Sequence, residues 1–394
     1  MSKKILVIPS WYPNAGNELG GSFFREQAQL LNDNGFDIKI LFGIEKELKL
    51  FKYLKIKLKS VLKRNGVNRN YLMQDPEAYS FYIYHYKKWP KKWKLKKSKQ
   101  SYQAAFKTIT AHWKPELIHA QCSANAGIYS HALSTSNNIP FVITEHQTFI
   151  LNYYNKKVQK GIKEAIENAS KIGAVSYHQQ RSILMNSMDC NPEIIWNLMD
   201  ENKFKINANQ ANSKFTIVTI TYSQLIKDTE TFFKSLEAFQ TISKDDFESI
   251  IIGNAAFNNG SKANSTYFEA LAKKYNVLDK CKFYPQLSRT EINSKLQTCD
   301  VFVSTSIAET YGVAVREAML CGKPVIATKS GGVEDSITAE TGMLVNIKDA
   351  EAIAQSLLKI KNKQPVFNPK NIRSYIIKQS GRAAFIKTMT DFYN

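Results

Sequence analysis

Strand-length apolar runs alternate with helical patterns from the beginning of the chain. Residues 3–9 are almost continuously apolar, which is typical of a buried strand, and residues 36–42 show a second such run. Between them, residues 23–34 place Phe24 and Leu31 on one face of a predicted helix. This order predicts a β-α-β unit, which opens a parallel sheet with a right-handed crossover.

The same alternation continues along the rest of the chain. In the first half, further strands are predicted at residues 117–119, 141–143 and 172–175. In the second half, strands are predicted at residues 215–220, 249–252, 282–284, 301–304 and 324–327, and helices at residues 228–240, 266–275, 290–297 and 313–320. The polar, asparagine-rich residues 200–214 are predicted to form a linker. The sequence therefore predicts an α/β fold with two Rossmann-like, doubly wound domains.

Composition supports two globular domains with a basic surface. The 394 residues exceed what one core commonly serves, and a hydrophobic content of 43% suffices for packed cores. The formal net charge of +20 is expected to attract polyanions, such as nucleotide phosphates or anionic lipid. The five scattered cysteines favour a reducing compartment over a disulfide framework or a zinc site. No apolar stretch reaches about 18 residues, so we expect a cytoplasmic protein.

The densest group of candidate chemistry follows the predicted strand at residues 301–304. Glu309 lies in the loop after this strand, and Glu317 lies about one turn into the next predicted helix. Both carboxylates can therefore face one crevice at the carboxyl end of the sheet, where they can accept hydrogen bonds from the vicinal hydroxyls of a sugar or a ribose. Taken alone, two glutamates at this spacing are more typical of solvated helix charges.

The surrounding pattern decides between these two interpretations. Together with the segment 321–326, Cys-Gly-Lys-Pro-Val-Ile, the two glutamates closely resemble the Glu-x7-Glu motif of retaining glycosyltransferases of family GT4, which have the GT-B fold. The pair Gly20-Gly21 resembles the glycine loop of this family that approaches the donor phosphates, although by itself it reads as an ordinary βα loop. His146, after the strand at residues 141–143, resembles the active-site histidine of the family, although a lone histidine is usually structural.

This resemblance implies the organisation of the whole chain. Residues 1–200 are expected to form the acceptor-side domain, with a basic insertion at about residues 46–107, and residues 201–371 the domain that binds the nucleotide sugar, with a central cleft between the two. The terminal helix, residues 372–394, is expected to return to the first domain. The reaction implied is retaining transfer of a sugar from a UDP- or GDP-sugar to the hydroxyl of a lipid-linked or polysaccharide acceptor, in cell-surface glycan synthesis.

The resemblance also implies the residues of the site. Catalytic roles are expected for His146, Glu309 and Lys227. The expected donor-binding residues are Gly20, Gly21, Tyr222, Lys227, Glu309, Thr310, Tyr311, Gly312, Val313 and Glu317. No metal is implied, and no cofactor other than the nucleotide-sugar co-substrate, because the diphosphate clamp of the family consists of cationic side chains.

The phosphate clamp departs from the family pattern. The family usually carries Gly-Arg and then Lys-Gly at the start of the second domain, where this chain has Thr221-Tyr222 and Lys227-Asp228. Lys227 is retained, but Tyr222 is a neutral donor in place of an arginine that can bind a phosphate with two hydrogen bonds. Arg289 and Lys329 are candidates to supply the charge that is lost.

A second departure is Arg316, which stands where the family commonly has an aliphatic residue. The departures motivate two alternative functions. One is another reaction on the same fold, namely a sugar-nucleotide epimerase or a phosphorylase. The other is a non-catalytic binding scaffold.

Lysines and aromatic residues crowd the segment 49–99. Residues 49–64 alternate lysines with leucine, isoleucine and phenylalanine, which is typical of a basic amphipathic helix on an anionic membrane surface. The alternative is a solvated face of a lysine-rich protein. A nucleic-acid partner is not expected, because no recognised nucleic-acid-binding motif accompanies the charge. If the membrane interpretation holds, the protein is peripheral on the inner face of the cytoplasmic membrane.

Overall fold

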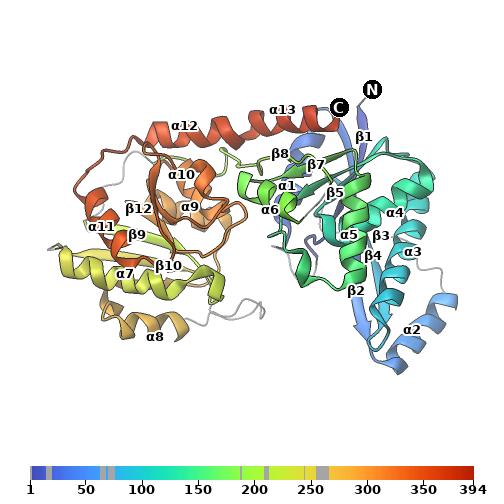
Figure 1. Cartoon of the computed structure of the whole chain (residues 1–394), viewed down its shortest axis with the longest axis horizontal. Coiled ribbons are helices and arrows are strands. Elements are labelled where there is room, and N and C mark those ends of the chain that lie inside the picture. Colours follow the sequence, from blue (N-terminus) through green and yellow to red (C-terminus); the bar gives the residue numbers. More distant parts are fainter. Residues whose placement is uncertain are drawn as a thin grey trace. The chain divides into compact units, whose positions relative to one another are not determined.

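The computed structural model describes residues 2–14, 20–62, 68–69, 76–186, 189–207, 213–243, 245–253 and 266–394. The chain divides into two compact units. The first unit comprises Met1–Val175, Gln179–Ile195 and Ile386–Asn394, and the second comprises Ser176–His178 and Trp196–Phe385. Each unit contains one sheet with helices packed on it (Figure 1).

The first unit contains an eight-stranded sheet in the order β3-β4-β2-β1-β5-β6-β7-β8. Its strands are β1 (Lys3–Pro9), β2 (Phe36–Leu48), β3 (Asn68–Arg69), β4 (Glu77–Tyr86), β5 (Leu117–Gln121), β6 (Phe141–Glu145), β7 (Lys171–Ala174) and β8 (Glu193–Ile194). Neighbouring strands run parallel, except that β3 is antiparallel to β4. The predicted β-α-β opening is confirmed, since α1 (Ser22–Asn32) lies between β1 and β2.

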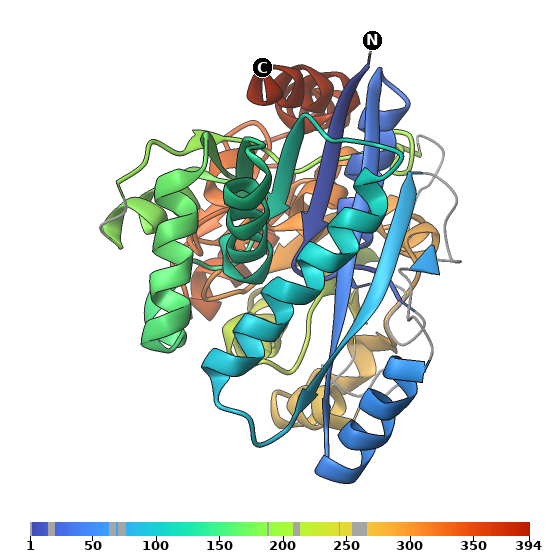
Figure 2. The same cartoon turned by 90° about the vertical axis from the view of Figure 1, so that its right-hand side faces the viewer.

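Helices cover the faces of this sheet. The other helices of the first part of the chain are α2 (Leu50–Leu62), α3 (Lys91–Thr110), α4 (Ile128–Asn137), α5 (Lys156–Asn168) and α6 (Tyr177–Met185). Figure 2 shows α3, α4 and α5 side by side across one face of the sheet. Because the central strands β5 and β6 are covered on both faces, all their residues are buried, and they read as apolar runs rather than alternating patterns.

The basic stretch at about residues 46–107 extends the sheet, although the sequence suggested an insertion. β4 pairs in parallel with β2 over ten positions, from Lys39 opposite Glu77 to Leu48 opposite Tyr86. α3 packs on the sheet through a buried face, and the Gly43 N–H donates a hydrogen bond of 2.9 Å to the hydroxyl of its Tyr102. The lysines of α3 obscured this strand and helix in the sequence. Residues 63 and 64, at the end of the predicted amphipathic helix, lie outside the described residues.

The second unit contains a six-stranded parallel sheet in the order β11-β10-β9-β12-β13-β14. Its strands are β9 (Phe215–Ile220), β10 (Phe247–Ile252), β11 (Cys281–Tyr284), β12 (Val301–Ser304), β13 (Val325–Thr328) and β14 (Gly342–Val345). Its helices are α7 (Thr229–Ile242), α8 (Thr266–Lys274), α9 (Arg289–Gln297), α10 (Val313–Leu320), α11 (Ala350–Lys361) and α12 (Pro369–Ser380). The prediction of two doubly wound α/β domains is therefore confirmed.

Helix starts in the second unit follow local capping chemistry. Ser288 and Glu291 form a capping box at the start of α9, in which each side chain accepts a hydrogen bond from the backbone of the other. Asn368 caps α12, which has a proline in its first turn. Two helices replace the single terminal helix predicted from residue 372. α12 ends at Ser380, the extended Gly381 follows, and α13 (Arg382–Tyr393) completes the chain.

His119 connects the end of the chain to the first sheet. This fully buried side chain lies on β5, and its Nδ1 is 2.8 Å from the hydroxyl of Tyr393 while its Nε2 is 2.8 Å from Oγ1 of Thr144. Burial lowers the pKa of His119 from 6.5 to about 3, because it removes the water that would stabilise an imidazolium ion.

This buried histidine predicts a loss of stability in acid. The unfolded chain binds a proton at His119 below pH 6.5, whereas the folded chain does so only near pH 3, so stability is lost progressively as the pH falls between these values. We expect the change from pH 7 to pH 5 to cost about 2 kcal/mol of unfolding free energy at this residue. Urea titrations of wild type and His119→Gln at both pH values measure this, and an equal loss in the variant would contradict it.

Candidate functional site

The loop that carries Glu309 lies beyond the carboxyl end of β12 in the second sheet. It is held against the loop that follows β13 by two backbone hydrogen bonds. The N–H of Glu309 donates to the carbonyl of Ser330 at 2.7 Å, and the N–H of Gly332 donates to the carbonyl of Glu309 at 2.8 Å. These bonds fix the backbone of Glu309 at the edge where parallel α/β sheets bind ligands.

The side chain of Glu309 is ion-paired. Its Oε1 accepts hydrogen bonds from the Lys227 ammonium and, at 2.8 Å, from the Ser306 hydroxyl. The Glu309 side chain remains 17% exposed and that of Lys227 23% exposed, so ligands can reach both. Lys227 is positioned by Thr305, whose hydroxyl lies 3.1 Å from the Lys227 carbonyl. The structure therefore brings together two of the three residues predicted to be catalytic.

Glu317 is the more buried carboxylate of the pair. It lies on the second turn of α10, its side chain is only 5% exposed, and its Oε1 is 3.4 Å from the Arg289 Nη2 at the start of α9. The pKa of the Tyr222 hydroxyl responds to its burial and to the charges of both glutamates. Burial raises the pKa of Tyr222, and the negative charges of Glu317 and Glu309 raise it further. Each carboxylate thus has its own cation, Lys227 for Glu309 and Arg289 for Glu317.

The segment between the two glutamates offers mainly its backbone. The Tyr311 side chain is buried, and its hydroxyl donates a hydrogen bond of 2.9 Å to the Asn197 carbonyl. Gly312 adopts a left-handed conformation with φ = 76° at the N-cap of α10, where no side chain caps the helix. The N-terminal N–H groups from Val313 onward, next to Thr310, form an end of positive potential that can bind an anion.

The two candidates for the missing cation differ in their surroundings. Arg289 pairs with Glu317. It therefore belongs to what we call the carboxylate cluster, which consists of Glu309, Glu317 and the two cations paired with them, Lys227 and Arg289. Lys329 is exposed, and in the described part of the chain the ion pairs of Glu309 and Glu317 are with Lys227 and Arg289. Only one of these candidates therefore lies at the carboxylates.

The predicted residues of the first unit also come together. Gly21 has φ = 78° at the N-cap of α1, and a β-carbon there would lie 2.7 Å from the Trp11 carbonyl oxygen, so this turn next to Gly20 requires glycine. The adjoining helix places Phe23 and Phe24 against the His146 ring, with centroids 5.5 and 4.9 Å away. The glycine turn and His146 thus border one region at the carboxyl edge of the first sheet.

Two supporting residues were missed in the sequence. Gln121, the last residue of β5, places its Oε1 2.5 Å from Nε2 of His146, an arrangement in which Nε2 carries the proton. Glu145 is buried and accepts hydrogen bonds from the N–H groups of Ser123, His146 and Gln147. No sequence spacing reveals either contact, although both residues end strands of a parallel sheet, which is a general signal of a functional position.

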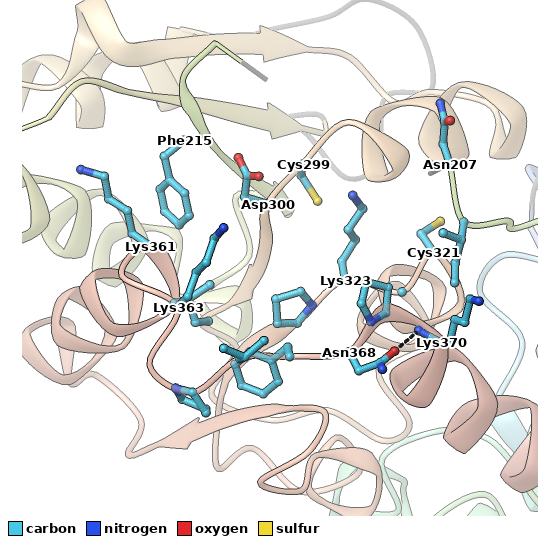
Figure 3. A pocket seen from close by; sticks show the side chains of 18 residues that line it. Asn207, Phe215, Cys299, Asp300, Cys321, Lys323, Lys361, Lys363, Asn368 and Lys370 are labelled. Carbon is cyan, nitrogen blue, oxygen red and sulfur yellow. Dashed lines mark hydrogen bonds between the residues drawn. The ribbon is translucent and has the colours of Figure 1, made fainter. Parts of the chain in front are cut away.

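A cavity of about 780 Å³ lies at the other edge of the second sheet. Its lining includes Phe215 at the start of β9 and Asp300 and Pro324 immediately before β12 and β13, so it borders the amino ends of the strands. Figure 3 shows Lys323 and Lys363 among the side chains around it. Residues 321–324 of the motif segment line this cavity, but none of the residues predicted to be catalytic or donor-binding does.

Comparison with known proteins is consistent with this geometry. Residues 201–380 match the family model described as glycosyl transferases group 1. The chain is 25% identical over 374 residues to a Bacillus subtilis (strain 168) protein named "Putative teichuronic acid biosynthesis glycosyltransferase TuaC", covering 92% of this chain and 90% of that one. Among solved structures, it resembles sucrose-phosphate synthase from Thermosynechococcus elongatus, with a TM-score of 0.76, 18% identity and coverage of 99% and 98%. It also resembles Anabaena Alr3699/HepE in complex with UDP, with a TM-score of 0.74, 16% identity and 99% coverage of both chains. These structural likenesses show the GT-B fold.

Proposed function

We propose that the chain transfers a sugar from a UDP- or GDP-sugar to an acceptor hydroxyl with retention of configuration. The match of residues 201–380 to the family model described as glycosyl transferases group 1 supports this proposal. In this reaction the bond between the anomeric carbon and the diphosphate breaks, a bond to the acceptor oxygen forms, and the proton of the acceptor hydroxyl passes to the leaving diphosphate. The observation that carries the proposal is the carboxylate cluster, in which Glu309 and Glu317 each contact a cation at the carboxyl edge of the second sheet.

The residues of the cluster have distinct proposed roles. Glu309 accepts hydrogen bonds from the hydroxyls of the transferred sugar, and the deeper Glu317 accepts them from the ribose. Lys227 and the N–H groups at the start of α10 stabilise the charge that develops on the leaving diphosphate. No step in this scheme requires a metal ion.

The first unit has a proposed role on the acceptor side. There, the backbone at Gly20 and Gly21 offers N–H groups to phosphate oxygens, and the protonated Nε2 of His146 orients the reacting groups. The buried carboxylate of Glu145 holds the backbone after β6, so that the His146 ring keeps its position between Gln121 and α1.

The relatives support the class of substrate. HepE has been crystallised with UDP and with UDP-glucose, which supports a nucleotide-sugar donor. The name of the Bacillus relative refers to teichuronic acid biosynthesis, which supports a cell-surface polysaccharide or its lipid-linked precursor as acceptor.

A donor panel tests this proposal. The protein is incubated with UDP-glucose, UDP-galactose, UDP-N-acetylglucosamine and GDP-mannose, with and without EDTA, and bound ligand and released nucleotide are read by mass spectrometry. We expect one donor to bind and to release its nucleoside diphosphate, also in EDTA. An epimerised donor without release would favour the epimerase, and failure of the folded protein to bind any donor would favour the scaffold.

We also propose that α2 binds an anionic membrane surface. Phe51 and Leu58, which are 91% and 70% exposed, lie with the exposed Leu54 at positions i, i+3 and i+7 and so form one apolar stripe. Tyr53 faces the protein instead, with its ring centroid 5.1 Å from that of Trp89. Lysines 49, 52, 55 and 57 flank the stripe. This arrangement fits shallow insertion between anionic headgroups. Among the described residues, no helix is long and apolar enough to cross a membrane.

Charging this stripe is expected to release the protein from vesicles. The double substitution Phe51→Glu and Leu58→Glu should lower cosedimentation with phosphatidylglycerol-containing vesicles at least about tenfold, because each buried apolar side chain contributes about 1.5–3 kcal/mol. Val366→Glu is the control, since Val366 is 79% exposed but belongs to the second unit. Equal binding of all three proteins would reject the membrane role of α2.

A further inference from the structure

A fully buried arginine lies beneath the candidate donor site. Arg316, on α10, has no exposed surface, and its guanidinium carbon lies 3.8 Å from the centroid of the Tyr311 ring. Its Nη2 donates a hydrogen bond of 3.0 Å to the Gly332 carbonyl. Within the described part of the chain, its Nε and Nη1 atoms have no hydrogen-bond partner. A buried cation with so few hydrogen bonds is costly, and an apolar side chain would avoid this cost.

The guanidinium group of Arg316 lies close to the N-terminus of α10. A β-carbon built on Gly312 would lie 3.7 Å from the Arg316 Nη1. Gly312 is the uncapped N-cap of α10, so the buried charge adds to the positive potential of the helix end. Burial lowers the pKa of Arg316, while the charges of Asp335 and Glu309 favour its protonated form. The unpartnered Nη1 and the helix N-terminus thus present positive charge at one place.

The other cations of the carboxylate cluster are already engaged. Lys227 pairs with Glu309, and Arg289 pairs with Glu317. Tyr222 is neutral and supplies no positive charge, and burial and the charges of Glu317 and Glu309 raise the pKa of its hydroxyl. Among the described residues, a diphosphate that carries two or more negative charges would therefore meet two carboxylates and two cations that neutralise one another, unless Arg316 contributes a further positive charge.

We propose that Arg316 is a positioning residue that supplies this charge from below the loop and so strengthens diphosphate binding at the start of α10. This inference rests on the proposed function. The Arg316 side chain does not touch the donor. It acts through the peptide groups of Gly312, and through its contacts with Tyr311 and Gly332, which join the loop of Glu309 to the loop after β13. Removing the charge lowers affinity for the diphosphate and leaves recognition of the nucleoside unchanged.

Calorimetric titration with UDP, GDP, uridine and guanosine tests this role in Arg316→Met and Arg316→Lys. We expect Arg316→Met to lower affinity for the preferred diphosphate about tenfold or more, with nucleoside affinity unchanged and melting temperature not reduced. Arg316→Lys keeps the charge and should remain within about threefold of wild type. Adding Tyr222→Arg to Arg316→Met should restore part of the lost affinity.

Arg373→Met is the matched control. Arg373, on α12, donates hydrogen bonds to the carbonyls of Leu320, at the other end of α10, and Phe204. Its removal should lower stability without changing the ratio of diphosphate to nucleoside affinity.

Wild-type diphosphate affinity in Arg316→Met, or an equal loss for nucleoside and diphosphate, would overturn the proposal. If Arg316→Met does not fold, a loss of diphosphate affinity of about tenfold or more in Arg316→Lys, which keeps the charge, would overturn it. Wild-type protein that binds neither nucleotide would instead reject the proposed function and this inference with it.

Discussion

Glu309→Gln is expected to reduce sugar transfer by about 10²- to 10³-fold, the effect typical of removing one electrostatic contact to a transition state. Glutamine has nearly the same shape, so the loop should keep its backbone hydrogen bonds to Ser330 and Gly332. The amide lacks the negative charge that holds Lys227. Its single oxygen also accepts hydrogen bonds from hydroxyl groups more weakly than a carboxylate does. The loss should appear mainly in kcat, because Glu309 is proposed to act on the transferred sugar rather than on the nucleotide.

The matched control is Glu340→Gln, an exposed glutamate of the same unit, because Lys227 and Arg289 are paired with Glu309 and Glu317. Melting temperature and transfer rate are measured for both variants with the donor that the panel identifies. A Glu309→Gln enzyme with wild-type kcat would remove Glu309 from the mechanism. A proportionate fall in melting temperature would assign it a structural role instead.

Gly332→Ala is expected to lower transfer about 100-fold or more while leaving the rest of the second unit folded. A β-carbon at Gly332 would lie 2.0 Å from the Thr310 carbonyl oxygen and 2.8 Å from the Tyr311 nitrogen. These are backbone atoms, so no side-chain rotation relieves the overlap, and the segment that holds Glu309 and Gly312 must move. A displacement of about 1 Å in a positioning loop is enough for such a loss.

Gly35→Ala separates this steric effect from a general loss of stability. Gly35 has φ = +98°, but a β-carbon there would meet no atom within 4 Å. It should therefore cost about 1–2 kcal/mol of stability through backbone strain alone and leave transfer unchanged. Transfer rates and urea unfolding are compared for the two variants. If Gly332→Ala retains full activity, the contact between the two loops does not control the position of Glu309.

Sequence patterns predicted most strands because these are buried on both faces. β12 and β13 are short apolar runs bounded by polar or glycine-containing turns, and their boundaries match the predictions within one residue. β4 escaped prediction because only three of its ten residues are buried and because it lies between two lysine-rich helices in the sequence. The wrong prediction of one terminal helix has a local cause, since Gly381 interrupts a pattern whose apolar spacing continues on both sides.

The sequence identified those site residues that belong to a family motif, but it did not identify the side chains that contact them. The motif named Glu309, Glu317 and Lys227, and the structure places Lys227 against Glu309. Arg289 was one of two unranked candidates until its contact with Glu317 distinguished it from Lys329. Gln121 lies 25 positions from His146, yet neighbouring parallel strands bring their side chains together. Pairings of this kind depend on strand order and register, which local patterns do not encode.

The sequence by itself determined that the chain folds as two parallel α/β domains, because the order of apolar strands and amphipathic helices is written in local periodicity. It also determined which residues follow the carboxyl ends of those strands. Only the tertiary structure decided which charges neutralise one another and which lie buried. Arg316 is the clearest case, since a charged residue on a helix is expected in solvent, and only the packing of Tyr311 and Gly332 around it makes it an interior cation.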